Sequence, residues 1–186
     1  SRMLGLKGED ERSAFVRFHI CVNETIREIE RASAAQDGEL IESVLIPEGR
    51  RRTLCISSQA GCAFGCVFCA TGRMGFGRHL RPAEIAAQVR ELMLGPEAGP
   101  PTNVVFMGMG EPLANYDAVV RALAIIQDPN GLALSHRRIT LSTAGLVPQM
   151  RRLGQDSPVN LAVSLHAAED RIRTELMPIN ATYPLD

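Results

Sequence analysis

The apolar positions of this chain fall into two alternating patterns from Gly38 onward. Short runs such as Asn103-Val-Val-Phe-Met are almost continuously apolar, as is typical of strands buried on both faces. Between these runs, apolar residues recur every three or four positions, as on one face of a helix. The pattern predicts strands over residues 40–46, 53–58, 103–107, 138–142 and 160–164. It predicts helices over residues 82–95, from 115 past 126, through 150–153 and over 169–176.

This alternation predicts an α/β fold with a parallel sheet and right-handed crossovers. Four successive strand–helix units over residues 37–186 favour a barrel or part of one. In such barrels the loops that leave the carboxyl ends of the strands hold the chemistry. Residues 1–36 differ: the stretch 11–35 is charged and helix-prone, so we expect a helical lead-in there.

Composition narrows the class of protein. With 186 residues and 45% hydrophobic content the chain can bury a core as one globular domain or part of one. No apolar run approaches the roughly 20 residues of a membrane helix, and the polar start is no signal peptide. Five cysteines, three of them in one loop, do not resemble a disulfide framework. We therefore expect a soluble protein of the cytoplasm.

The charge pattern has one local feature. The net charge is −1, so no global basic field indicates a nucleic-acid partner, but all except one of the 20 basic residues are arginine. Arginine suits bidentate contact with phosphate, yet biased composition and solvated surface would give the same pattern. The arginines cluster at residues 50–52, at 73, 78 and 81, at 137–138 and at 151–152.

Cys62, Cys66 and Cys69 form a CxxxCxxC run, and no cysteine or histidine follows at the spacing of a fourth zinc ligand. Structural zinc takes four protein donors, whereas an iron–sulfur cluster held by three thiolates leaves one iron open. Two alternatives remain: zinc with Cys55 or His79 as the fourth donor, or buried thiols without a metal.

Phe68 stands directly before the last cysteine, and the whole run resembles the signature of the radical SAM superfamily. The resemblance implies a 4Fe–4S cluster on the three cysteines and S-adenosylmethionine (SAM) on the open iron, with Phe68 near its adenine; core packing is the alternative for this ring. Gly108-Met-Gly-Glu-Pro follows a predicted strand and resembles the superfamily's GGEP motif. This implies that Gly110 and Glu111 contact SAM, where an ordinary turn is the alternative.

Further motifs make the resemblance closer. They are Leu54-Cys-Ile-Ser-Ser-Gln, Arg138-Ile-Thr-Leu-Ser-Thr-Ala-Gly, Leu161-Ala-Val-Ser-Leu-His-Ala and Leu176-Met-Pro-Ile-Asn. With the cysteine run they resemble the RlmN family, radical SAM enzymes that methylate C2 of an adenine in 23S rRNA and tRNA through a methyl-cysteine. The related Cfr enzymes methylate C8, and the Gly-Glu-Pro sequence favours C2. A noncatalytic zinc-stabilised module is the alternative from another class.

The resemblance assigns roles to residues outside the cysteine loop. It implies SAM contacts for four strand-end residues, which are Ser142, Ser164, Leu165 and His166. It implies that Cys55 forms a disulfide with the methyl-carrying cysteine to release the methylated base, and that Glu42 accepts the proton from C2. Without the resemblance, a strand-end serine or an exposed strand glutamate is most simply structural.

The resemblance also implies partners and an incomplete fold. The partners are the two RNA substrates and an electron donor such as flavodoxin, for a monomer without membrane contact. The fold is a partial (βα)6-type radical SAM barrel with parallel strands, truncated at the C-terminus, with residues 1–36 a remnant of an N-terminal accessory region. No cysteine follows Cys69, so the methyl carrier is missing and we expect a fragment that is inactive alone.

Overall fold

The computed structural model describes residues 16–22, 25–31, 39–94 and 99–185. The strands are β1 Val16–Val22, β2 Thr25–Arg31, β3 Ile41–Glu48, β4 Arg51–Cys55, β5 Gln59–Gly61, β6 Phe76–His79, β7 Asn103–Phe106, β8 Ile139–Thr143 and β9 Asn160–Val163. The α-helices are α1 Ala70–Arg73, α2 Pro82–Leu94, α3 Tyr116–Gln127, α4 Val147–Asp156 and α5 Asp170–Leu176. Short 3-10 helices are η1 Pro112–Asn115, η2 His136–Arg138 and η3 Pro178–Ala181.

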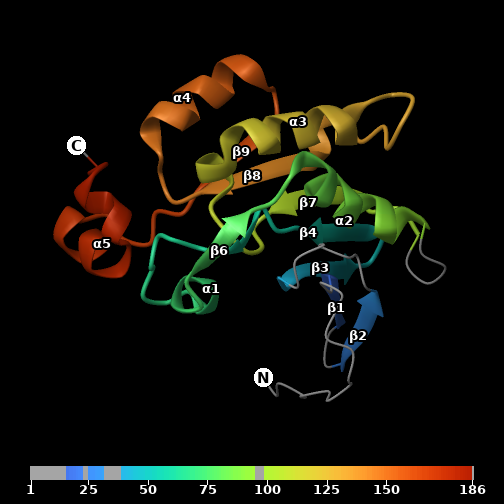
Figure 1. Cartoon of the computed structure of the whole chain (residues 1–186), viewed down its shortest axis with the longest axis horizontal. Helices are drawn as coiled ribbons and strands as arrows, with labels where there is room; N and C mark the ends of the chain where they lie inside the picture. Colours follow the sequence, from blue (N-terminus) through green and yellow to red (C-terminus); the bar gives the residue numbers. More distant parts are fainter. Residues whose placement is uncertain (1–15, 23–24, 32–38, 95–98, 186) are drawn as a thin grey trace.

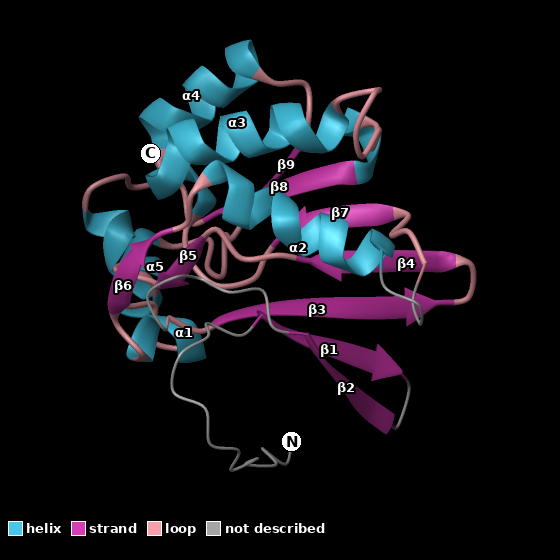
Figure 2. Cartoon of the chain, turned by 45° about the vertical axis from the view of Figure 1, so that its right-hand side comes forward, coloured by secondary structure: helices cyan, strands magenta, loops and turns pink. Residues whose placement is uncertain are grey.

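Seven strands form one open sheet in the order β2-β1-β3-β4-β7-β8-β9, and Figure 2 shows them side by side from one edge of the sheet to the other. The strands β4, β7, β8 and β9 run parallel, as predicted. The prediction is wrong for β3, which pairs antiparallel with β4. Only Gly49 and Arg50 connect these two strands, and a two-residue turn reverses the chain without room for a crossover. The fold is α/β with a mixed sheet.

The helices α2, α3 and α4 lie over one face of this sheet (Figure 1). Apolar side chains on that face, such as Leu54, Phe106 and Leu141, are buried in one core with Ile85 of α2 and Leu123 of α3. The alternation of a strand places the neighbouring residues on the opposite face. In β3, for example, Ile41, Ser43 and Leu45 are buried, while Glu42 is exposed. The face without these helices is therefore free to carry polar chemistry.

The helix expected within residues 11–35 is wrong where the structure describes the chain. Val16–Val22 and Thr25–Arg31 are strands, β1 paired antiparallel with β2 and parallel with β3. The sequence Val16-Arg-Phe-His-Ile-Cys-Val alternates with a period of two, and pairing with a neighbouring strand outweighs a weak helical preference. The rest of this stretch lies outside the described residues. The division at residues 36 and 37 stays a prediction.

Past the end of β4 the chain stays close to β7. The amide of Ile56 donates to the carbonyl of Val105 (2.9 Å), and that of Ser58 donates to Met109 (2.9 Å). The chain then enters the β5–β6 hairpin, whose connection contains the three cysteines and α1. No helix within the described ranges has the length and apolar character needed to cross a membrane.

Candidate functional site

A cavity of about 300 Å³ opens where the parallel strands β4, β7, β8 and β9 end. It brings together nine residues that the sequence nominated: Cys62, Cys66, Phe68, Cys69, Gly110, Glu111, Ser142, Ser164 and His166. These residues come from the β5–β6 connection and from the ends of β7, β8 and β9. Three nominated residues do not line the cavity: Glu42, Cys55 and Leu165.

The cysteine loop is held at both ends and in its middle. The amide of Cys62 donates to the Gly75 carbonyl (2.8 Å), which closes the loop beside the β5–β6 hairpin. The amide of Val67 donates to Leu176 at the end of α5 (3.0 Å). Gly61 has a φ of +76°, and a Cβ there would lie 2.0 Å from the Gly75 carbonyl oxygen, so only glycine fits at this entry to the loop.

The three thiols interact electrostatically. Burial raises the pKa of Cys62, and the thiol of Cys69 and the carboxylate of Glu111 raise it further. Burial also raises the pKa of Cys66, and Cys62 and Cys69 add to the shift. Thiolates placed this close together repel one another and are stabilised by a cation between them. The donor set therefore fits an iron–sulfur cluster, to which each cysteine contributes one ligand.

A zinc centre finds less support in this geometry. Among the described residues, no three His, Cys, Asp or Glu side chains are placed to hold a single metal ion together. Of the two proposed fourth donors, Cys55 is absent from the cavity lining. The Nδ1 atom of the other, His79, lies 2.9 Å from Gln59 Nε2 and so has a hydrogen-bonding partner already.

The Gly110–Glu111 turn is fixed by the Gln59 side chain and by neighbouring backbone amides. Gly110 has a φ of +94°, and a Cβ at this position would lie 2.4 Å from Gln59 Cβ. The Glu111 amide donates to Gln59 Oε1 (2.8 Å), while its own carboxylate accepts from the amides of Leu113 (3.0 Å) and Ala144 (2.7 Å). Burial raises the pKa of Glu111, and these hydrogen bonds oppose the rise. Glu111 thus joins the end of β7 to the end of β8 while facing the cavity.

Aromatic and hydroxyl groups form another part of the wall. The rings of Phe68 and His166 are in contact, with centroids 4.2 Å apart and planes tilted by 38°. Phe68 is 48% exposed, so core packing does not describe this side chain. His166 has a φ of +59°, an uncommon conformation for a residue with a Cβ. The hydroxyl oxygens of Ser142 in β8 and Ser164, directly after β9, lie 3.5 Å apart.

Arg173 on α5 is a positioning residue that sequence reasoning missed. It is only 3% exposed. Its Nε donates to the Leu165 carbonyl (3.1 Å), its Nη2 donates to the Ala144 carbonyl (2.7 Å), and its Nη1 donates to Asn180 Oδ1. Arg173 therefore fixes the chain after β8 and the chain after β9. Nothing in the sequence separates Arg173 from the exposed Arg171 two positions earlier, since both read as helix-surface charges.

Cys55 and Glu42 lie together on the open face of the sheet. Cys55 pairs with Val44, two residues from Glu42, and the Glu42 charge acts on the thiol. Burial raises the pKa of Cys55 to about 11, a rise that Glu42 reinforces and a hydrogen bond with the backbone of Met107 opposes. Met107 itself lines the cavity, so Cys55 lies directly behind the cavity wall. Leu165 contributes its backbone carbonyl to Arg173 and is 48% exposed.

Known proteins share this sequence and fold. Residues 56–183 match the radical SAM superfamily. A dual-specificity RNA methyltransferase RlmN from Syntrophobacter fumaroxidans is 65% identical over 153 residues, which are 81% of this chain and 44% of that protein. The enzyme of the same name from Desulfotalea psychrophila is 53% identical over 161 residues, with the same two shares. The chain thus spans less than half the length of these curated relatives.

A solved structure gives the same result. The crystal structure of a radical SAM methyltransferase from Sphaerobacter thermophilus has a TM-score of 0.81 and 43% identity, covering 93% of this chain and 52% of that one. Enzymes of the superfamily use a 4Fe–4S cluster and SAM, the cofactors that the cavity's donors fit. With the cysteine loop, the Gly110–Glu111 turn and the strand-end serines all inside the matched range, the chain belongs to the radical SAM superfamily and is of the RlmN type.

Proposed function

We propose that the chain is the core of a radical SAM RNA methyltransferase that methylates C2 of an adenine in 23S rRNA and in tRNA through a methyl-cysteine. The observation that carries the proposal is that Cys62, Cys66 and Cys69 share one cavity with Gly110, Glu111 and the strand-end serines. Relatives named dual-specificity RNA methyltransferase RlmN support the choice of RNA as substrate. The Gly-Glu-Pro sequence at residues 110–112 favours C2 over C8.

Cys62, Cys66 and Cys69 would hold the cluster, and the wall built from Gly110, Glu111 and the strand-end residues would hold SAM. The bound cluster would supply an electron for reductive cleavage of SAM. Glu111 presents a carboxylate that can accept from an ammonium group, since each of its oxygens has a second lone pair beside the backbone bonds. The exposed Phe68 and His166 rings offer an apolar contact for a base.

Cys55 and Glu42 would act on the RNA adduct from the open face. In this proposal Glu42 takes the proton from C2. The Cys55 thiolate then attacks the sulfur of the methyl-carrying cysteine, so that a disulfide forms and the bond from that sulfur to the added carbon breaks. The released carbon takes a proton from solvent, which completes the methyl group on the base. Because burial and the Glu42 charge both raise the pKa of Cys55, the thiol rests protonated and must lose its proton before it attacks. Protonation of Glu42 by C2 would remove the charge that disfavours the thiolate, so the two steps assist each other.

The proposed reaction also requires a source of electrons. An electron donor such as flavodoxin would reduce the cluster, and the protein would act as a monomer in the cytoplasm.

The test is anaerobic reconstitution of the intact protein with iron and sulfide. Iron, inorganic sulfide and 5′-deoxyadenosine formed from SAM under reducing conditions are then measured. We expect all three, and we expect each substitution of Cys62, Cys66 or Cys69 by alanine to abolish SAM cleavage. Cys55→Ala is the matched control, which should keep the cluster and SAM cleavage but lose methylation. A protein with one zinc and no sulfide would refute the proposal. If the methylated nucleoside from the RNA substrate co-elutes with C8-methyladenosine, the C2 assignment is refuted.

A further inference from the structure

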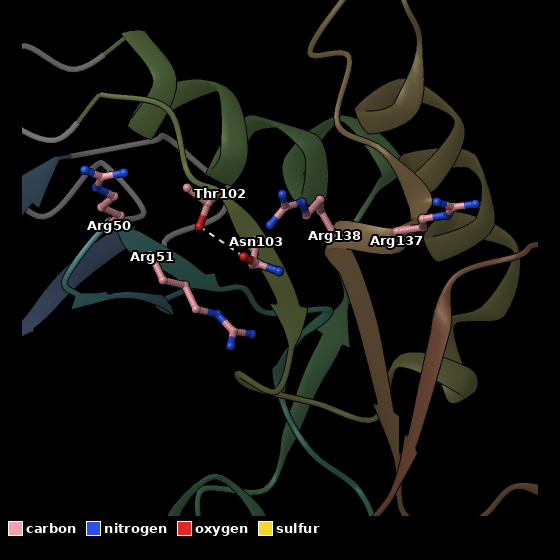
Figure 3. A pocket seen from close by; sticks show the side chains of 6 residues that line it. All are labelled: Arg50, Arg51, Thr102, Asn103, Arg137 and Arg138. Carbon is pink, nitrogen blue, oxygen red and sulfur yellow. Dashed lines mark hydrogen bonds between the residues drawn. The ribbon is translucent and has the colours of Figure 1, made fainter.

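A second cavity lies at the opposite end of the parallel strands from the cysteines. It has a volume of about 730 Å³ and is lined by Arg50, Arg51, Thr102, Asn103, Arg137 and Arg138 (Figure 3). Arg51 begins β4, Asn103 begins β7, and Arg137 and Arg138 directly precede β8. We call these six residues the arginine groove. Strands of four or five residues, at about 3.3 Å per residue, separate it from the catalytic end by roughly 15 Å.

The four arginine side chains of the groove have no partner in the part of the chain that the structure describes. All four are exposed, and none of their guanidinium groups takes part in a hydrogen bond or ion pair with a described residue. Glu48, the cross-strand neighbour of Arg51, forms no ion pair with it. No carboxylate lines the groove.

The two other arginine clusters contain guanidinium groups that pair with carboxylates of the described residues. Arg78 and Arg81 both bind Glu84, at 2.9 and 3.2 Å. Arg152 binds Asp117 (3.0 Å) and Asp156 (3.3 Å). Arg73, Arg121 and Arg151 form no ion pair with a described residue either, but the groove differs in that four guanidinium groups without an ion pair line one cavity. The groove is therefore a local positive surface on a chain whose net charge is only −1.

The arrangement of the groove indicates the shape of its ligand. In Figure 3 the guanidinium groups are spread along the strand ends and point in different directions, with Arg138 toward Asn103 and Arg137 away from it. A compact anion would reach only one or two of them, whereas a chain of phosphates can contact several in turn. Between the arginines, the Asn103 side chain accepts from Thr102 Oγ1 (3.0 Å) and keeps its amide donors for sugar or phosphate oxygens.

We propose that the arginine groove binds the phosphate backbone of the RNA substrate at a point remote from the adenine that enters the cysteine cavity. The inference rests on the proposed function, because it takes RNA as the substrate. Arginine contacts to phosphate add affinity without reading sequence, which suits an enzyme that accepts two different RNAs. The groove would hold the body of the RNA while the cavity selects the base.

The test measures binding of a fluorescent RNA hairpin to the intact protein at several salt concentrations. The variant Arg51→Gln/Arg138→Gln should lose roughly tenfold in affinity and should reduce the slope of log K against log salt by about 2. SAM cleavage without RNA should not change. The control Arg90→Gln/Arg171→Gln removes the same charge from arginines that already pair with Glu91 and Glu175, so it should keep the wild-type affinity and slope. Arg51→Lys/Arg138→Lys should restore most of the slope.

Three results of the binding experiment would overturn the inference. Wild-type affinity and slope in the groove variant would overturn the inference, as would an equal loss in the control. Displacement of the RNA by stoichiometric inorganic pyrophosphate would also overturn it, because a compact anion would then be the ligand. A wild-type protein that cleaves SAM yet neither binds nor methylates RNA would overturn the proposed function itself, which separates the two failures.

Discussion

The two ends of the parallel strands differ in how their charged side chains are placed. At the carboxyl end, Glu111 and Arg173 are buried, and backbone amides, carbonyls or the Asn180 side chain occupy their polar atoms. At the amino end, Arg51 and Arg138 are exposed and have no partner within the described residues. Both ends gather charged residues that are far apart in sequence, but only one end fixes them in place.

The difference follows from the cost of burying charge. A charged group removed from water must be compensated by fixed hydrogen bonds, and those bonds hold it in one geometry. An exposed guanidinium keeps its hydration and its rotamer freedom, so it can adapt to a ligand but cannot position one accurately. A small cofactor with defined atoms suits the first end, and a long flexible polyanion suits the second.

Gly110→Ala should give the largest effect, because it disturbs the fixed end at its tightest point. The new Cβ would lie 2.4 Å from Gln59 Cβ, at a φ of +94°. The positive φ costs about 1–2 kcal/mol and the overlap a further 1–3 kcal/mol or so. We expect the cavity wall to shift and SAM binding, measured by equilibrium dialysis of the reconstituted protein, to be lost.

Gly154→Ala is the control for this substitution. Gly154 lies in α4, has no positive φ, and would place its Cβ more than 4 Å from every atom outside its own turn of helix backbone. Alanine there should raise the free energy of unfolding by up to about 1 kcal/mol and leave SAM binding unchanged. RNA binding through the arginine groove should survive in both variants. Normal SAM binding by Gly110→Ala would show that the carboxyl end is not fixed as described.

Arg173→Met should rank second. Methionine fills much of the same volume but leaves the carbonyls of Leu165 and Ala144 without their buried donor, which costs about 3 kcal/mol in the free energy of unfolding. The matched control is Arg171→Met on the same helix, where the arginine side chain is 75% exposed and, among the described residues, pairs with Glu175 alone. That change should cost less than about 0.5 kcal/mol. Denaturant titration of both variants checks the prediction, and equal losses would refute it.

These two arginines also show how far the sequence can be read. The spacing of Cys62, Cys66 and Cys69 and the glycines before Glu111 are local features, so sequence motifs can point to residues that the structure brings into one cavity. Arg171 and Arg173 look alike because their burial depends on how α5 packs against chain segments far away in sequence. No local signal carries that information.

The fold was predictable to the same degree. The period of apolar residues located five of the strands and four of the helices after residue 38, since it reflects which face each element buries, but it did not predict α1 or the β5–β6 hairpin. It did not reveal that β1 and β2 form a hairpin, because a charged stretch gains its strand partners from β3. It also did not reveal the arginine groove, because the sequence cannot show which guanidinium groups find carboxylates across the fold.

The smallest effect concerns Cys55, which lies at the opposite end of β4 from Arg51. Burial and the Glu42 charge raise the pKa of this thiol to about 11. A negative charge disfavours the thiolate, so Glu42→Gln should lower that pKa and speed alkylation by iodoacetamide a few-fold at any pH between 7 and 9. Peptide mapping by mass spectrometry distinguishes Cys55 from the other cysteines.

Glu48→Gln, at the far end of β3, is the control and should leave the rate unchanged. Below the pKa, the alkylation rate changes about tenfold for each unit by which the pKa changes, so even a small effect of Glu42 is measurable. Equal rates in the Glu42→Gln and Glu48→Gln proteins would mean that the Glu42 charge does not act on the thiol. The pairing of Glu42 with Cys55 in the proposed mechanism would then fail.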